Sequence, residues 1–249
     1  MNRYSSQYAV PRVSPVVKVL LIASAVVFFL SLVLERAAGI NLTALFGFTP
    51  ARLLQGFVWQ PFTYVFLHAT FFHLLFNLLV IWTVGSELED LWGRKTFLGY
   101  LLVCGLGAAL TYGLFSLVGF GPGPNAPVVG SSGIVYGLLL AYGILFGDRT
   151  MYFFMLFPMP ARYFVMLLGG IELVSSVFYS NTGVAHLAHL GGMLFGFLFL
   201  VSMAQWRKRE KIDQRARQAE KERQKRLKKA GHLKLVQEDL EKDDPKTWN

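Results

Sequence analysis

The sequence is short of cysteine and of charged residues. Cys104 is its single cysteine, which excludes a scaffold stabilised by disulfides within the chain. Only 16% of the residues are charged and 54% are hydrophobic, against about 25% charged in typical soluble domains. Residues 206–249 hold 15 of the 24 Lys and Arg residues. Because the basic residues gather at one end, we expect no nucleic-acid partner despite the net charge of +9.

Uninterrupted stretches without any charge fill most of the first 206 positions, at residues 19–34, 53–86, 96–147 and 173–206. A helix needs about 20 apolar residues to cross a bilayer, so these stretches indicate membrane spans. The third stretch is too long for one crossing, and glycines and prolines at 119–127 divide it in two. We therefore predict an all-α membrane protein with a six-helix bundle, at residues 16–35, 62–85, 96–117, 131–147, 162–179 and 183–204.

The first predicted helix also has features of a signal peptide, because Arg3, Arg12 and Lys18 precede an apolar run. That run is longer than the apolar part of a usual signal peptide and lacks a small-residue cleavage site, which favours a retained anchor. Lys and Arg are frequent in the segments that would lie inside the cell, whereas the segments that would lie outside contain only two basic residues, Arg36 and Arg52. Both termini are therefore predicted to face the cytoplasm.

Three parts follow along the chain: a cytoplasmic segment at 1–15, the membrane domain at 16–204 and a basic cytoplasmic tail at 205–249. The tail alternates Lys and Arg with Glu and Gln, which indicates a partly helical segment near an anionic membrane surface. A solvated tail that mainly fixes the topology is the alternative. The external loop at 36–61 is rich in aromatic residues, so we expect part of it to lie at the membrane interface.

Polar residues inside the predicted spans are the most informative ones, because burying them in lipid is costly unless they are paired or hydrated. Those that stand out are His68, His73 and Asn77 in the second span, Ser131 and Ser132 in the fourth, and His186 and His189 in the sixth. His73 and Asn77 are four residues apart and share a helix face, whereas His68 would face elsewhere.

Serine and histidine together point to nucleophilic catalysis. A serine hydroxyl attacks once a base accepts its proton, and histidine is the usual base near neutral pH. Ser131 or Ser132 is therefore a candidate nucleophile, and each of the four membrane histidines is a candidate base. The flanking Gly130 and Gly133 suit a tight start to the fourth helix, whose first N–H groups are placed to stabilise an oxyanion. The polar pair of the second span, His73 and Asn77, offers further donors.

Glycines at a spacing of four favour close contact between two of the helices. Gly192 and Gly196 form such a stripe on the sixth predicted helix, and Gly133 and Gly137 form one on the fourth. If the stripes meet, the last membrane histidine comes close to the two serines. Tyr136, on the same helix as the serines, would then pack against the imidazole.

A metal site is an alternative use of the histidines. His186 and His189 are three residues apart, and His68 or His73 would complete a ligand set. The sequence has no His-Glu-x-x-His run, and we expect no metal. Glu172 has no obvious histidine neighbour in the sequence, so it is interpreted as a helix-packing or hydrated group.

Taken together, the motifs over residues 16–204 resemble the rhomboid intramembrane serine proteases. The tetrapeptide from Gly130 to Gly133 fits the family's Gly-x-Ser-Gly motif, which implies that Ser132 is the nucleophile and Ser131 fills the variable position. The run from Ala188 to Gly196 fits Ala-His-x-x-Gly-x-x-x-Gly, which implies that His189 is the base and His186 only a neighbour.

The family's second-helix pattern, a His followed by His-x-x-x-Asn, is similar to His68 and to the run from His73 to Asn77. It implies that His73 and Asn77 join the Ser132 backbone N–H in an oxyanion hole, and that His68 supports the adjacent loop. Tyr136 matches the tyrosine that packs on the catalytic histidine.

Outside the site, Glu89 and Gly93 are similar to the family's cytoplasmic Glu-x-x-x-Gly turn, which implies a structural role. One departure concerns the first external loop. Many members carry Trp-Arg there, whereas this chain has Trp59-Gln60.

The resemblance implies hydrolysis of peptide bonds in or near transmembrane segments by a Ser132 and His189 dyad, without a cofactor or an acidic third member. Single-span membrane proteins are the expected substrates, and a bacterial inner membrane is the expected location. The alternative is a non-catalytic chaperone or adaptor that binds transmembrane helices on the same fold, against which the intact serine and histidine argue. A transporter or metal channel would need charged groups along a pore.

Overall fold

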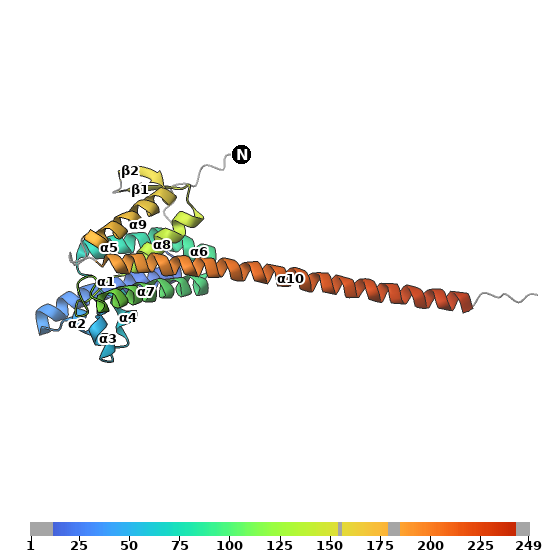
Figure 1. Ribbon diagram of the computed structural model, residues 1–249, viewed down its shortest axis with the longest axis horizontal. Coiled ribbons are helices and arrows are strands. Elements are labelled where there is room, and N and C mark those ends of the chain that lie inside the picture. Colours follow the sequence, from blue (N-terminus) through green and yellow to red (C-terminus); the bar gives the residue numbers. More distant parts are fainter. Residues whose placement is uncertain (1–11, 154–155, 179–184, 243–249) are drawn as a thin grey trace, which may run out of the picture. The chain divides into compact units, whose positions relative to one another are not determined.

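The computed structural model describes residues 12–153, 156–178 and 185–242, and the chain is mostly helical (Figure 1). Its contacts divide it into two compact units, Met1–Leu200 and Val201–Asn249. The helices are α1 (Pro15–Ala38), α2 (Leu42–Phe46), α3 (Pro50–Leu54), α4 (Gln60–Thr63), α5 (Phe71–Val80), α6 (Ser86–Trp92), α7 (Arg94–Leu117), α8 (Ser132–Leu145), α9 (Ala161–Phe178) and α10 (His186–Lys242).

A short antiparallel hairpin, which the all-α prediction missed, precedes α9. It pairs β1 (Thr150–Phe153) with β2 (Phe157–Pro160), with Thr150 opposite Pro160 and Phe153 opposite Phe157. Four residues per strand are too few to give a clear alternating pattern in so apolar a sequence.

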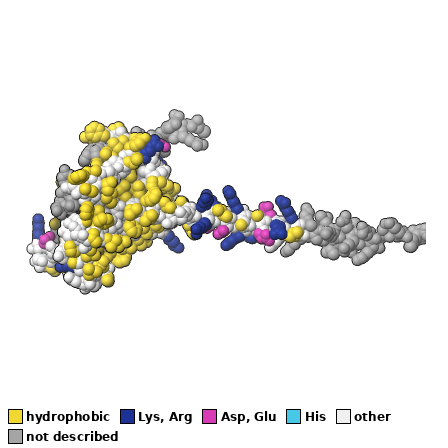
Figure 2. Space-filling view, in the orientation of Figure 1, with side chains coloured by type: hydrophobic (Ala, Val, Ile, Leu, Met, Phe, Trp, Pro, Cys, Tyr) yellow, Lys and Arg dark blue, Asp and Glu magenta, His cyan; other side chains and the backbone are white. Residues whose placement is uncertain are grey.

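Five helices in the described part of the chain are long and apolar enough to cross a membrane. Four of them are α1, α7, α9 and α10, and the fifth is the continuous helical segment formed by α5, η2 (Ile81–Gly85) and α6. The apolar helix α8 has only 14 residues, which is about 21 Å at 1.5 Å per residue and less than the hydrocarbon thickness of about 30 Å. Hydrophobic side chains cover much of the visible surface of the first unit, as expected for contact with lipid (Figure 2). The sixth crossing stays a prediction.

The predicted continuous helix over 62–85 is wrong. A 3-10 turn, η1 (Tyr64–Phe66), ends the helical segment that starts at α4, and Leu67 is extended, with φ −86° and ψ 146°. The helix restarts at α5 because the Thr70 side chain caps it, accepting a hydrogen bond from the His73 N–H at 3.1 Å. A π-helical segment, η2 (Ile81–Gly85), then joins α5 to α6. His68 consequently lies in a loop and not on the helix.

The predicted boundary between the sixth membrane helix and the tail is not a helix end. α10 continues to Lys242, and its side chains from Arg207 to Leu227 are exposed and include alternating basic and acidic residues (Figure 2). Some predicted features lie outside the described residues. They are the end of the fifth predicted helix at 179, the start of the sixth at 183, most of the N-terminal segment, and residues 243–249.

Tyrosine hydroxyls tie the buried helix α7 to its neighbours. Tyr100 of α7 donates to the carbonyl of Gly137 in α8 at 2.6 Å, and Tyr64 of η1 donates to the carbonyl of Gly105 in α7 at 2.7 Å. Both tyrosines are almost fully buried. Each hydroxyl is thus satisfied by a backbone carbonyl of a neighbouring element, as burial in an apolar interior requires.

The loop between α1 and α5 is anchored at Trp59-Gln60. Trp59 Nε1 donates to the carbonyl of Leu45 at 3.0 Å, and the fully buried Gln60 accepts a hydrogen bond from the Thr49 N–H at 3.1 Å. Phe48 and Val128 exchange backbone hydrogen bonds of 3.0 and 2.8 Å. This bridge fixes the segment that leads into α8.

Glu89, in the middle of α6, caps the N-terminus of α1. Its buried carboxylate accepts hydrogen bonds from the N–H groups of Val16 at 3.0 Å and Val17 at 3.1 Å, and from the Ser14 hydroxyl. A carboxylate is favourable there because the first N–H groups of a helix lack intrahelical partners and carry partial positive charge.

Replacing this carboxylate tests its structural role. We expect Glu89→Gln to lower the free energy of unfolding by about 2 kcal/mol, because the charged acceptor of these bonds becomes neutral. Glu87→Gln on the same helix is the control, since the Glu87 side chain is half-buried and pairs with Arg149 near the surface. This replacement should change stability by about 1 kcal/mol or less. Equal melting temperatures of the two variants in detergent would contradict this assignment.

Candidate active site

The first turns of three helices meet at one place in the first unit. Ser132 is the first residue of α8, His189 lies in the first turn of α10, and His73 and Asn77 lie in the first two turns of α5. The N-terminus of a helix presents unpaired N–H groups and partial positive charge. This end of the bundle is therefore suited to negative charge.

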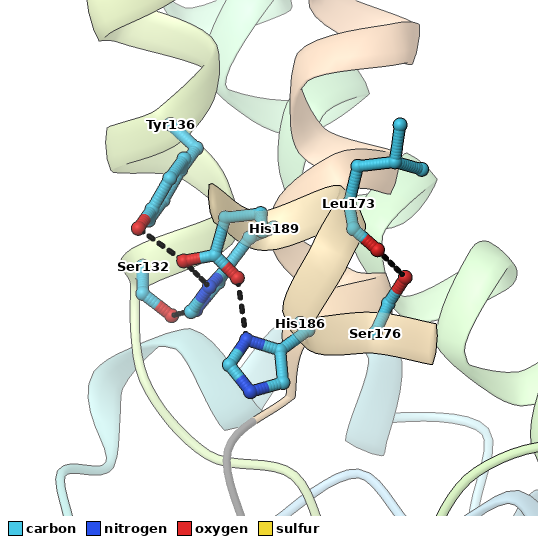
Figure 3. A network of polar contacts seen from close by, with 7 residues as sticks. Ser132, Tyr136, Leu173, Ser176, His186 and His189 are labelled. Carbon is cyan, nitrogen blue, oxygen red and sulfur yellow. Dashed lines mark hydrogen bonds and ion pairs between the residues drawn. The ribbon is translucent and has the colours of Figure 1, made fainter. Parts of the chain in front are cut away.

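Ser132 and His189 are brought together, although 57 residues separate them. Nε2 of His189 lies 2.8 Å from the Ser132 hydroxyl, and the imidazole is buried. The ring of Tyr136 stacks on the imidazole with a centroid distance of 4.4 Å and an interplanar angle of 8°. Figure 3 shows these three side chains pointing toward one another. The hydroxyl donates to Nε2 whenever that nitrogen is unprotonated.

Close contact between α8 and α10 produces this distance. A Cβ added to Gly192 would overlap the backbone carbonyl of Gly133, and one added to Gly137 would lie 3.1 Å from the carbonyl oxygen of Gly192. The two glycine stripes therefore meet at Gly192. Gly196 instead faces Tyr100 and Cys104 of α7, where an added Cβ would lie 2.6 Å from the tyrosine hydroxyl.

Gly130 holds the approach to α8 in a conformation that side chains rarely adopt. Its φ is +113°, and an added Cβ would lie 2.6 Å from Cε1 of His73. Its N–H donates to the carbonyl of Tyr64 at 3.0 Å. The imidazole of His73 thus packs directly on the loop that carries the two serines.

The two serines have different histidine partners. Ser131 is buried, and its hydroxyl lies 3.3 Å from Nε2 of His68, whose Nδ1 lies 3.3 Å from the carbonyl of Phe66. The rings of His68 and His73 meet edge to face with centroids 5.1 Å apart. His68 therefore joins the loop before α5 to the loop before α8.

Two groups are candidate donors to an oxyanion formed at Ser132. The Ser132 N–H begins α8 and so has no intrahelical partner. Asn77 is buried, and its Nδ2 has no hydrogen-bond partner among the described residues. A buried amide with free N–H groups is uncommon and is suited to a ligand.

Glu172 is a member of the site that the sequence analysis missed. Its Oε1 lies 3.1 Å from Nδ1 of His189, its Oε2 lies 2.6 Å from Nδ1 of His186, and the Tyr136 hydroxyl donates to Oε1. Sequence separations of 14 and 17 residues hid these contacts. The available signal was the carboxylate itself, because an acidic group inside an apolar helix requires a partner.

These contacts also change the expected metal ligands. Among the described residues, Glu172, His186 and His189 are the group whose donor atoms, all within 4.8 Å of one another, could hold a metal ion. The metal alternative named His68 or His73 as the further ligand, but these two histidines lie against Ser131 and Gly130 instead.

Comparison with known proteins identifies the family. Residues 55–206, more than half of the chain, match the family model described as Rhomboid domain. The chain belongs to the rhomboid family. It is 31% identical over 147 residues to the rhomboid protease GluP of Bacillus subtilis, covering 58% of this chain and 26% of the relative. It is 29% identical over 150 residues to the rhomboid protease GlpG of Yersinia pseudotuberculosis, covering 60% of this chain and 48% of the relative.

A eukaryotic rhomboid is equally similar. Rhomboid-like protein 15 of Arabidopsis thaliana is 30% identical over 161 residues, which are 61% of this chain and 38% of the relative. The chain spans well under half the length of several of these curated relatives. The predicted family is confirmed, and this rhomboid is an integral multi-pass membrane protein. Because the relatives include eukaryotic proteins, the bacterial location stays a prediction.

The contact at Gly192 gives a direct test of the packing. We expect Gly192→Ala to lower the free energy of unfolding by about 1–3 kcal/mol, because the new methyl group forces α8 away from α10. Gly170→Ala in α9 is the matched control, since an added Cβ there meets nothing within 4 Å and alanine favours a helix by about 1 kcal/mol. Melting temperatures in detergent should fall for the first variant only, and an unchanged value for Gly192→Ala would refute the close contact.

Proposed function

We propose that this rhomboid chain is an intramembrane serine endopeptidase with Ser132 as its nucleophile and His189 as its base. The observation that carries the proposal is the 2.8 Å contact between Nε2 of His189 and the Ser132 hydroxyl at the start of α8. Relatives with protease in their names support the same class of reaction.

In the first step His189 Nε2 takes the proton of Ser132 while Oγ forms a bond to the carbonyl carbon of the scissile peptide. The negative charge that develops on the carbonyl oxygen is held by the Ser132 N–H together with Asn77 and His73. His189 then gives its proton to the leaving amine nitrogen as the C–N bond breaks. Water, deprotonated by the same histidine, hydrolyses the acyl-enzyme.

The depth of the site suits membrane-embedded substrates. Because α8 is shorter than the hydrocarbon layer is thick, its first residue lies within that layer if its other end reaches the cytoplasmic boundary. Two N–H groups just before α8 are paired, with hydrogen bonds from Val128 to Phe48 and from Gly130 to Tyr64, as membrane depth requires. Single-span substrates would have to unwind locally there, because an intact helix hides its carbonyls. The distribution of Lys and Arg supports an orientation with this end of the bundle outside and the chain termini inside.

Covalent labelling tests the dyad. A fluorophosphonate probe should label the purified wild-type chain, and Ser132→Ala or His189→Ala should lower labelling and cleavage of a model transmembrane substrate by about a thousandfold or more. Ser131→Ala is the matched control, since this neighbouring serine contacts His68 and not His189. Cleavage that survives Ser132→Ala would reject the nucleophile. A folded wild-type chain that neither labels nor cleaves would favour the chaperone or adaptor.

A second variant tests the oxyanion donors. We expect Asn77→Ala to lower kcat about a hundredfold, less than loss of the nucleophile, because one donor to the oxyanion is lost while the others stay. Phe76→Leu, at an exposed position on the same helix, should leave kcat unchanged. Steady-state cleavage rates decide the matter, and a wild-type kcat for Asn77→Ala would remove this residue from the oxyanion hole.

A further inference from the structure

Glu172 is an acidic side chain buried among apolar helices. It lies in α9, a helix long and apolar enough to cross a membrane, and it is only 5% exposed. An ionised carboxylate at such a place is costly unless specific partners compensate it. The partners that the structure gives to Glu172 all belong to the site around Ser132.

The carboxylate is divided between two histidines. Oε2 accepts a hydrogen bond from Nδ1 of His186 at 2.6 Å. Oε1 lies 3.1 Å from Nδ1 of His189, an ion-pair distance at which the ring N–H is not aimed squarely at the oxygen. The contact with His189 is therefore mainly electrostatic, and the bond to His186 fixes the other side of the carboxylate.

Tyr136 binds both the carboxylate and the imidazole. Its hydroxyl donates to Oε1 of Glu172, and its ring lies flat on His189 at 4.4 Å (Figure 3). One side chain of α8 thus sets the position of Glu172 from α9 relative to His189 from α10. Such a three-helix arrangement holds the imidazole plane and the carboxylate together.

The chemistry of His189 requires a particular protonation pattern. For Nε2 to accept the proton of Ser132, the resting proton of the imidazole must be on Nδ1, and a negative charge beside Nδ1 favours that tautomer. When the proton arrives, the ring becomes a buried cation. A negative charge 3.1 Å from Nδ1 stabilises this cation strongly, since the surroundings screen charges weakly.

We propose that Glu172 is the positioning residue of the Ser132 and His189 pair, held in place by His186 and Tyr136, so that the site works as a carboxylate-assisted triad. The proposal rests on the proposed function. In the reaction the proton moves from Ser132 Oγ to His189 Nε2 and then to the leaving amine nitrogen. Glu172 stays ionised throughout and takes no proton.

Charge removal at constant shape is the test, with the full chain in detergent and a model transmembrane substrate. Glu172→Gln should lower kcat about a hundredfold or more with KM within about twofold, and should slow fluorophosphonate labelling in parallel. Glu172→Asp keeps the charge and should retain most of the wild-type activity that Glu172→Gln loses. Ser176→Ala is the matched control, because Ser176 is buried one turn further along α9 and donates to the carbonyl of Leu173.

A second variant covers the case in which Glu172→Gln does not fold. Tyr136→Phe keeps the stacked ring and removes the hydroxyl that binds Glu172, so kcat should fall about tenfold at unchanged KM. Wild-type cleavage should also persist in a chelator. A wild-type kcat for folded Glu172→Gln would overturn the proposal. If Glu172→Gln does not fold, a wild-type kcat for Tyr136→Phe would overturn it. Loss of the wild-type chain's activity in the chelator would also overturn it.

These outcomes are distinct from failure of the proposed function. If Ser132→Ala is inactive while Glu172→Gln is fully active, the serine and histidine act without the carboxylate and only this inference fails. If the folded wild-type chain neither labels nor cleaves, the proposed function fails, and this inference fails with it.

Discussion

Where α8 crosses α10, the backbone of Gly133 lies so close to Gly192 that one added methyl group would overlap a carbonyl oxygen. The position of the site depends on this contact. Ser132 precedes Gly133 at the start of α8, and His189 lies about one turn before Gly192 in α10, so the approach of the two backbones sets the distance between hydroxyl and imidazole. On the far side, α7 closes the packing with Tyr100 and Cys104.

A second constraint is that polar groups inside a membrane need partners. Most polar side chains of the site have such partners: Glu172 contacts two histidines and Tyr136, and Ser131 pairs with His68. Asn77 Nδ2 differs, because it has no partner in the part of the chain that the structure describes. Asn77 follows by one turn His73, which packs on the loop before α8, and a donor without a partner there suits a reaction that develops negative charge.

Much of this arrangement was accessible from the sequence. The apolar runs predict most of the long helices to within a few residues, and the glycine spacing anticipates the contact at Gly192. Short-range motifs pointed to Ser132, His189, His73 and Asn77 because each lies in a helical segment with recognisable neighbours. The family resemblance fixed which serine and which histidine to pair, a choice that the residues alone left open.

The remaining features depend on tertiary contacts or on local breaks in the helices. His68 lies in a loop because the cap by Thr70 interrupts a run that is apolar throughout, and hydropathy does not register such a cap. Glu172 looked isolated because its histidines are 14 and 17 residues away on another helix. A partly helical tail was predicted, but its direct continuation from the last membrane helix was not, since charged sequence is compatible with helix and with coil alike.

The central claim is that one serine of the Ser131-Ser132 pair is an activated nucleophile. The most direct measurement is peptide mapping by mass spectrometry of the wild-type chain after reaction with a fluorophosphonate, with fragmentation that resolves the two adjacent serines. The account predicts a single adduct, on Ser132. An adduct on Ser131 or at another site, or no adduct on a folded chain, would contradict it.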